Sequence, residues 1–290
     1  MESAHIGPGY PFQFLPGLIN WITFFPLGTD KACLVSTDTY NHDPGFPLLS
    51  LTVRSLLLLL NKKRYSGTMK NFRSWLIKNI TLHQYDSKHE ELANAGTHGL
   101  GILLSIAATI LMIIKITGTN SQVSLTGALI FGFSMILLYS SSTFYHLSKG
   151  PIVKRLLRIM DHSTIYFLIA GTYTPVLLTV GGTAGWTIFG IEWALTILGI
   201  IFTLIFWGKY GLLHVLFYII MGWLAVFIWN PLMKTVTRPF IILMISGGLS
   251  YTLGTIVYGM KKMSFHHAVW HLFVLAGSVL LFLAIYLHLM

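Results

Sequence analysis

The sequence has few of the charged residues that a soluble protein of this size needs. Only 10% of its 290 residues are charged, whereas 54% are hydrophobic, and the mean hydropathy is +0.70. A typical soluble domain has about 25% charged residues. The composition therefore excludes an ordinary soluble domain and indicates an integral membrane protein.

Cysteine is almost absent, because Cys33 is the only one in the chain. A single cysteine excludes an internal disulfide framework and a cysteine-rich metal site. A bound metal ion would therefore need histidine and oxygen ligands.

Acidic residues are also scarce. The nine Asp and Glu residues are outnumbered by 19 Lys and Arg residues, which gives a formal net charge of +10. The basic residues fall mostly between apolar runs. This pattern is typical of membrane orientation rather than of a phosphate-binding surface, so we expect no nucleic-acid partner.

Residues 1–87 differ from the rest of the chain. Their apolar runs, 10–27 and 47–60, are broken by proline or are too short to cross a membrane, since a spanning helix needs about 20 apolar residues. We interpret 1–87 as an irregular N-terminal extension, with Met69 as an alternative start of the native protein. Residues 88–290 form the predicted membrane domain.

Apolar runs long enough to cross a membrane recur from residue 92 onward. The predicted spans are 94–116, 125–145, 159–180, 186–207, 212–230, 240–259 and 267–289. They predict an all-α fold in which seven transmembrane helices form a bundle. Most Lys and Arg residues precede the first span or follow the second, fourth and sixth. The positive-inside rule therefore places the N-terminus in the cytoplasm and the C-terminus outside, in a multi-pass protein of the plasma (inner) membrane.

Polar side chains gather at the cytoplasmic ends of three predicted spans. Ser142 and His146 end the second span, Asp161 lies in the first turn of the third, and His267 and His271 lie in the first two turns of the seventh. Such groups are costly in hydrocarbon and mark function by default. The predicted topology brings all five to one depth of the membrane.

The spacing of these residues favours a metal site. His267 and His271 are four residues apart, so a helix projects both rings from one face. Together with His146 they make a set of three imidazoles with an open fourth position, which is typical of catalytic zinc. Asp161 could orient a water molecule or accept its proton. The alternative is that the histidine pair only packs or caps at the membrane interface.

Glu91, Asn94 and His98 form a weaker group at the same end of the bundle. Their spacing of three and four residues puts them on one face of the first span. They could hold the second ring nitrogens of the metal ligands. Alternatively, Glu90 and Glu91 only complement the positive N-terminus of a helix.

The segments that contain these residues resemble the hemolysin III family, the bacterial branch of the progestin and adiponectin receptor proteins. The resemblance extends over residues 88–289 and includes ELANAGTHG (91–99), STFYH (142–146), 157–166, AGTYTP (170–175) and HAVWHLFVLAG (267–277). It implies a seven-helix bundle with a zinc ion near the inner leaflet. It also implies that His146, His267 and His271 are the zinc ligands, that Asp161 contacts the zinc through water, and that Ser142 is the serine of the motif.

The wider superfamily includes alkaline ceramidases, so the resemblance implies a zinc-dependent hydrolase with a membrane lipid as substrate or ligand. The bond that it would cleave is an amide or an ester. Two alternatives stay open: a cytolytic or membrane-perturbing protein with a structural zinc, and a non-catalytic receptor or regulator of membrane lipids. An open zinc position beside a carboxylate favours hydrolysis, whereas four protein ligands favour a structural role.

Overall fold

A computed structural model describes residue 67 and residues 70–82, 87–207 and 211–290. The apolar runs 10–27 and 47–60 lie outside the described residues, as does Met69. The predicted boundary between an N-terminal extension and a membrane domain stays a prediction.

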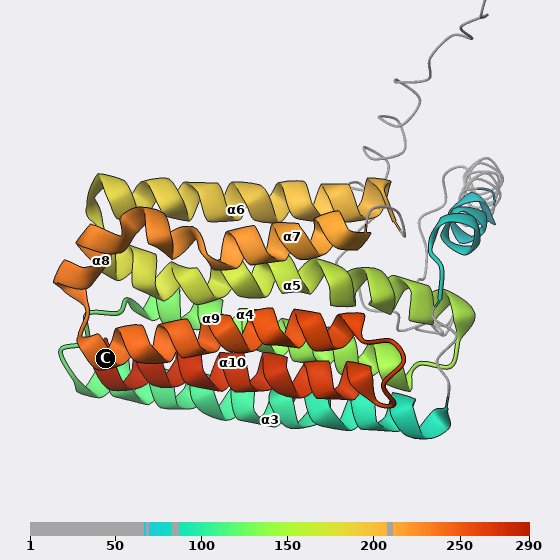
Figure 1. The fold of residues 1–290 in the computed structure, drawn as a ribbon, viewed down its shortest axis with the longest axis horizontal. Helices are drawn as coiled ribbons and strands as arrows, with labels where there is room; N and C mark the ends of the chain where they lie inside the picture. Colours follow the sequence, from blue (N-terminus) through green and yellow to red (C-terminus); the bar gives the residue numbers. More distant parts are fainter. Residues whose placement is uncertain (1–66, 68–69, 83–86, 208–210) are drawn as a thin grey trace, which may run out of the picture. The chain divides into compact units, whose positions relative to one another are not determined.

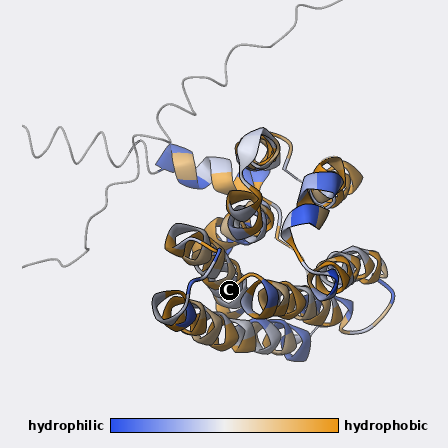
Figure 2. Ribbon diagram, turned by 90° about the vertical axis from the view of Figure 1, so that its left-hand side faces the viewer, coloured by the Kyte–Doolittle hydropathy of each residue, from blue (hydrophilic) through white to orange (hydrophobic). Residues whose placement is uncertain are grey.

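Long apolar helices dominate the described residues (Figure 1). Within this part of the chain, seven helical segments are long and apolar enough to cross a membrane. They are α3 (Lys88–Gly118), α4 (Leu125–Leu147), α5 (Pro151–Val180), α6 (Gly182–Ile205), the segment Gly211–Thr235, α9 (Arg238–Gly259) and α10 (His266–His288). Figure 2 views the helices end-on and shows mostly hydrophobic residues on their ribbons. The predicted all-α bundle of seven membrane-spanning helices is confirmed, while the orientation of its termini stays a prediction.

The helix α5 begins earlier than the sequence predicts. Its first residue is Pro151, and proline suits a first helical position because its N–H is not needed there. The predicted span began at 159, where the apolar run starts, but the basic residues before it are helical as well. Asp161 therefore lies in about the third turn of its helix, not in the first as predicted.

The fifth membrane-spanning segment, predicted over 212–230, extends over Gly211–Thr235 and is interrupted within that range. The helix α7 (Gly211–Gly222) is followed by the 3₁₀ helix η1 (Leu224–Ile228) and by α8 (Trp229–Thr235). The Tyr173 hydroxyl on α5 donates to the Gly222 carbonyl oxygen at 2.8 Å and accepts from the Ala225 N–H at 3.0 Å. Irregular backbone is tolerated at membrane depth only where protein groups satisfy it in this way.

The connection between α5 and α6 is a single residue, because α5 ends at Val180 and α6 begins at Gly182. Gly181 and Gly182 have φ angles of 60° and 57°. Only glycine adopts such angles without strain, because it has no Cβ. The two glycines thus let α6 begin directly after α5.

Packing brings the first and last long helices together. The helix α10 packs on α9 and α3, and α4 packs on α3 and α5 (Figure 1). The fully buried side chains of Met112, Phe131 and Tyr139 belong to the core between them. As a result, the starts of α3, α5 and α10 meet the end of α4 at one end of the bundle, and the predicted site residues lie there.

Candidate metal centre

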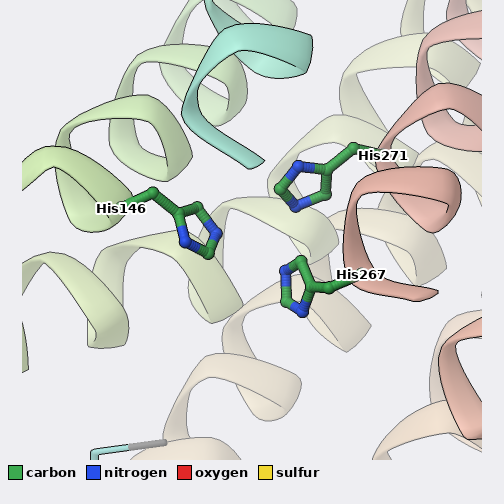
Figure 3. A group of neighbouring side chains, drawn as sticks. All are labelled: His146, His267 and His271. Atoms are coloured by element: carbon green, nitrogen blue, oxygen red, sulfur yellow. The ribbon is translucent and has the colours of Figure 1, made fainter. Parts of the chain in front are cut away.

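Three histidine side chains from two helices turn towards one another at this end of the bundle (Figure 3). His146 lies in the last turn of α4, while His267 and His271 lie in the first two turns of α10. Each offers one possible ligand nitrogen, and these three atoms lie within 4.8 Å of one another. All three residues are at most 5% exposed. One metal ion could therefore bind all three rings.

The start of α10 is fixed by a contact with the start of α3. Phe265 precedes α10 with a left-handed φ of 57°, and its backbone N–H donates to Glu90 Oε1 at 3.0 Å. Glu90 is itself held at the first turn of α3, where its N–H donates to the Ser87 hydroxyl at 3.1 Å. These bonds set the position at which His267 and His271 enter the bundle.

His146 is oriented by a carboxylate. Its Nδ1 lies 2.7 Å from Glu91 Oε2, and the other Glu91 oxygen lies 2.6 Å from the Lys154 ammonium. A ring that donates its Nδ1–H to a carboxylate has Nε2 as its acceptor nitrogen. Carboxylate–histidine pairs of this kind commonly orient metal ligands.

His271 is oriented by the backbone of α3. Its Nδ1 lies 3.1 Å from the Asn94 carbonyl oxygen and 3.1 Å from the Thr97 hydroxyl. A carbonyl can only accept, so Nδ1 carries the proton and Nε2 is the acceptor nitrogen. Among the described residues, Nε2 of His271 has no hydrogen-bond partner. A buried polar atom without a partner is costly, and a metal ion would provide one.

The other residues predicted to support the ligands are placed differently from Glu91. The His98 ring stacks on the His271 ring, with centroids 3.6 Å apart and planes at 15°. Neither His98 ring nitrogen has a hydrogen-bond partner in the described part of the chain, and the same is true of the Asn94 side-chain amide. Asn94 contributes its backbone carbonyl, and His98 contributes packing.

Asp161 and Ser142 are both buried beside the histidines. They are 5% and 0% exposed, on α5 and α4. The Asp161 carboxylate interacts with Ser142, His146 and Arg158, and it lies 3.7 Å from Nδ1 of His162. The structure thus brings together all five residues that the sequence placed at one depth.

An apolar cavity of about 380 Å³ borders the site at Asp161 and His98, although the three histidines do not line it. His98 and Asp161 line one end of it, and Leu232, Phe240 and Ile285 lie further along its wall. Its sides come from α5, α9, α10 and the interrupted segment α7–η1–α8. The cavity therefore joins a polar site to a long apolar space inside the bundle.

Sequence reasoning missed three residues that contact the site. Thr97 shares a helical face with Asn94, three residues before it, so the spacing could have revealed it. Lys154 and Arg158 lie on α5 in a segment predicted to be a loop, and no spacing relates Lys154 to Glu91. The packing of α4 on both α3 and α5 brings Lys154 to Glu91. Arg158 lies three residues before Asp161 on the same helix, so the spacing could have revealed it.

The residues of the candidate site lie in the part of the chain that is similar to known proteins. The family model described as Haemolysin-III related matches residues 86–282. "Hemolysin-3" of Bacillus cereus is 45% identical over 197 residues, which cover 68% of this chain and 90% of that protein. "Hemolysin-3 homolog" of Bacillus subtilis (strain 168) is 45% identical over 197 residues, which cover 68% and 92%. "Monocyte to macrophage differentiation factor" of Homo sapiens is 26% identical over 208 residues, which cover 69% and 85%.

Proposed function

This chain belongs to the Haemolysin-III related family, and from that premise we propose that it is a zinc-binding protein that hydrolyses an amide or ester bond of a membrane lipid. It is a multi-pass membrane protein, which in a bacterium means a protein of the plasma membrane. The proposal is supported above all by His146, His267 and His271, which could hold one metal ion, together with Asp161, which interacts with His146 and lines an apolar cavity.

The donor set fits zinc. Three imidazoles are a common protein ligand set for catalytic zinc, and they leave one coordination position for water or substrate. His146 and His271 each have Nδ1 turned to a protein partner, so each can offer Nε2 to the ion. A zinc ion bound here would supply Lewis-acid chemistry, because it polarises a carbonyl and acidifies water.

Asp161 and Ser142 have distinct roles in this proposal. The Asp161 carboxylate accepts a proton from the attacking water and later gives a proton to the leaving amine or alcohol. The Ser142 hydroxyl donates a hydrogen bond to the oxygen on which negative charge develops. Their burial excludes bulk water and strengthens both interactions.

The cavity favours a lipid as the substrate. Each methylene group that leaves water contributes about 0.8 kcal/mol to binding. If an acyl chain occupied the apolar part of the cavity, the bond that joins this chain to the lipid head group would lie at the polar end, beside Asp161. An amide or ester bond occupies that position in many membrane lipids.

The test is lipid turnover by the purified protein in vesicles, together with lipid profiling of cells. We expect Asp161→Asn to keep its zinc and to lower the turnover of a cleaved lipid by about 100- to 10,000-fold, the usual effect of losing a general base. The lipids that accumulate in cells with this variant identify the substrate class. Equal turnover by the variant and the wild type would remove Asp161 from the mechanism.

Cytolysis is a second candidate, favoured by the name "Hemolysin-3" of the relative from Bacillus cereus. In that case the zinc would be structural and lysis would need no hydrolysis. Dye release from lipid vesicles distinguishes the two functions. Release that is unchanged in Asp161→Asn would favour cytolysis, whereas release that is lost together with lipid turnover would favour hydrolysis.

A further inference from the structure

A second buried acidic side chain lies far from the histidines along the bundle. Glu192 is near the middle of α6 and is 0% exposed. Among the described residues, neither oxygen of its carboxylate has a hydrogen-bond partner. An ionisable group inside a membrane marks a functional site by default. The cost of an isolated buried charge is high, and binding a proton removes that charge.

Within the described residues, the elements around Glu192 offer it no cation. No other charged residue occurs in α6 or η1. On α5, the basic residues Lys154, Arg155 and Arg158 precede Asp161 at the far end, and on α8 Lys234 lies in the last turn. The titratable groups His214, Tyr166 and Tyr218 contact one another nearer the metal site. A salt bridge therefore does not explain why this carboxylate is buried.

Tyr173 links Glu192 to the interruption of the fifth span. Its ring packs with Ile188 of α6 around η1. The next residues along the two helices are hydrogen bonded, because Trp193 Nε1 donates to Thr174 Oγ1 at 3.2 Å, so α5 and α6 are in contact at the level of Tyr173 and Glu192. The Tyr173 hydroxyl bridges Gly222 and Ala225, whose backbone groups would bond within a continuous helix. Tyr173, Gly222 and Ala225 also line the apolar cavity. A change at Glu192 can thus reach the cavity wall through one side chain.

We propose that Glu192 is a proton-binding site that controls the interrupted fifth span through Tyr173. With the proton bound, no charge competes for the Tyr173 O–H, which stays on the Gly222 carbonyl. When the proton leaves to water, the carboxylate becomes the stronger acceptor, because hydrogen bonds to charged groups are about twice as strong as neutral ones. The hydroxyl then turns from Gly222 to Glu192, and η1 loosens together with the cavity wall.

Infrared spectroscopy of the purified protein in nanodiscs tests the proton site. A protonated carboxyl has a C=O stretching band that a carboxylate lacks. We expect this band in the wild type at neutral pH and expect it to disappear as the pH rises. Isotope-labelled glutamate should shift the band. The band should remain in Asp161→Asn and be absent from Glu192→Gln. Absence of a glutamate band at neutral pH would overturn the proposal. Loss of the band on adding sodium at constant pH would also overturn it, in favour of a metal-cation site.

Hydrogen exchange of the 222–228 amides tests the link to the span. Glu192→Gln keeps the side chain neutral at every pH. Dividing the exchange rate of the wild type by that of this variant therefore removes the ordinary pH dependence of amide exchange. Below the pH at which the band disappears we expect equal rates. Above it we expect the wild type to exchange at least about fivefold faster, the lower end of typical coupling between sites. Tyr173→Phe should exchange fast at all pH values. Equal rates of wild type and Glu192→Gln at every pH would overturn the control of the span.

Discussion

The histidine site and Glu192 are equally buried, but they are built in different ways. His146 and His271 are each oriented by a group from another helix, the Glu91 carboxylate and the Asn94 carbonyl. Glu192 has no such hydrogen-bond partner within the described part of the chain. Rigid positioning suits a metal ion that stays bound. A lone carboxylate suits a proton that binds and leaves.

The helices around the two sites also differ in how closely they pack and in how regular they are. Around the histidines, α4 packs extensively on α3 and α5, and α10 packs on α3. Around Glu192, α6 packs mainly on α5, and the neighbouring span is interrupted at η1. The first region is a fixed scaffold, whereas the second has an element that can change its hydrogen bonding.

The largest expected effect is at the metal ligands. The double variant His267→Ala/His271→Ala should lose the bound zinc, because one imidazole cannot replace three. Elemental analysis of purified wild-type protein should give about one zinc per chain, as expected for a site with a full ligand set. His266→Ala is the matched control, since the Nδ1 of this neighbour faces the Met263 carbonyl instead. A double variant with full zinc would disprove the ligand assignment.

A smaller effect is expected at the residue that orients His146. Glu91→Gln should weaken zinc binding by about 10- to 100-fold, the usual effect of losing an outer partner of a metal ligand. Competition with a zinc-binding dye measures the affinity. Glu90→Gln is the control, because a glutamine oxygen can still accept from the Phe265 N–H and this side chain contacts no histidine. Equal affinities of Glu91→Gln and the wild type would mean that the Glu91–His146 contact does not matter for binding.

The smallest effect on zinc is expected on the α6 side. A Cβ added at Gly199 would come within 2.5 Å of the Tyr166 ring, whereas one at Gly190 would meet nothing within 4 Å. Gly199→Ala should therefore lower stability by about 1–3 kcal/mol, as overpacking does, while zinc content stays unchanged. Gly190→Ala should leave zinc content unchanged and should not lower stability, because alanine favours a helix more than glycine does. Thermal unfolding in detergent measures stability, and zinc loss in Gly199→Ala would show that the two regions are not separate.

Much of the fold could be predicted because it follows from the lengths of apolar runs. The interruption at η1 could not, since Leu224–Ile228 is as apolar as a regular span and hydropathy does not distinguish a 3₁₀ helix from an α-helix. The hydroxyl that satisfies the interrupted backbone belongs to Tyr173, some fifty residues earlier in the chain. The start of α5 was missed for a related reason. Hydropathy marks only the apolar run that begins at 159, whereas the helix already begins at Pro151 and includes the charged residues in between.

The candidate site could be assembled from sequence because helix ends and four-residue spacing place side chains well. Those rules bring His146, Asp161, His267 and His271 to one level. They do not give the orientation of side-chain rings, so the stacking of His98 on His271 could not be predicted from them. They also do not give contacts between charges on different helices, such as that of Lys154 with Glu91.

X-ray absorption spectroscopy at the zinc edge of the purified protein tests the central claim most directly. The proposed site predicts three histidine nitrogens at about 2.0–2.1 Å and one further oxygen ligand that is not a fourth protein side chain. The spectrum of Asp161→Asn should keep the three histidine nitrogens. A site closed by four protein ligands, or a metal bound without histidine, would contradict the account.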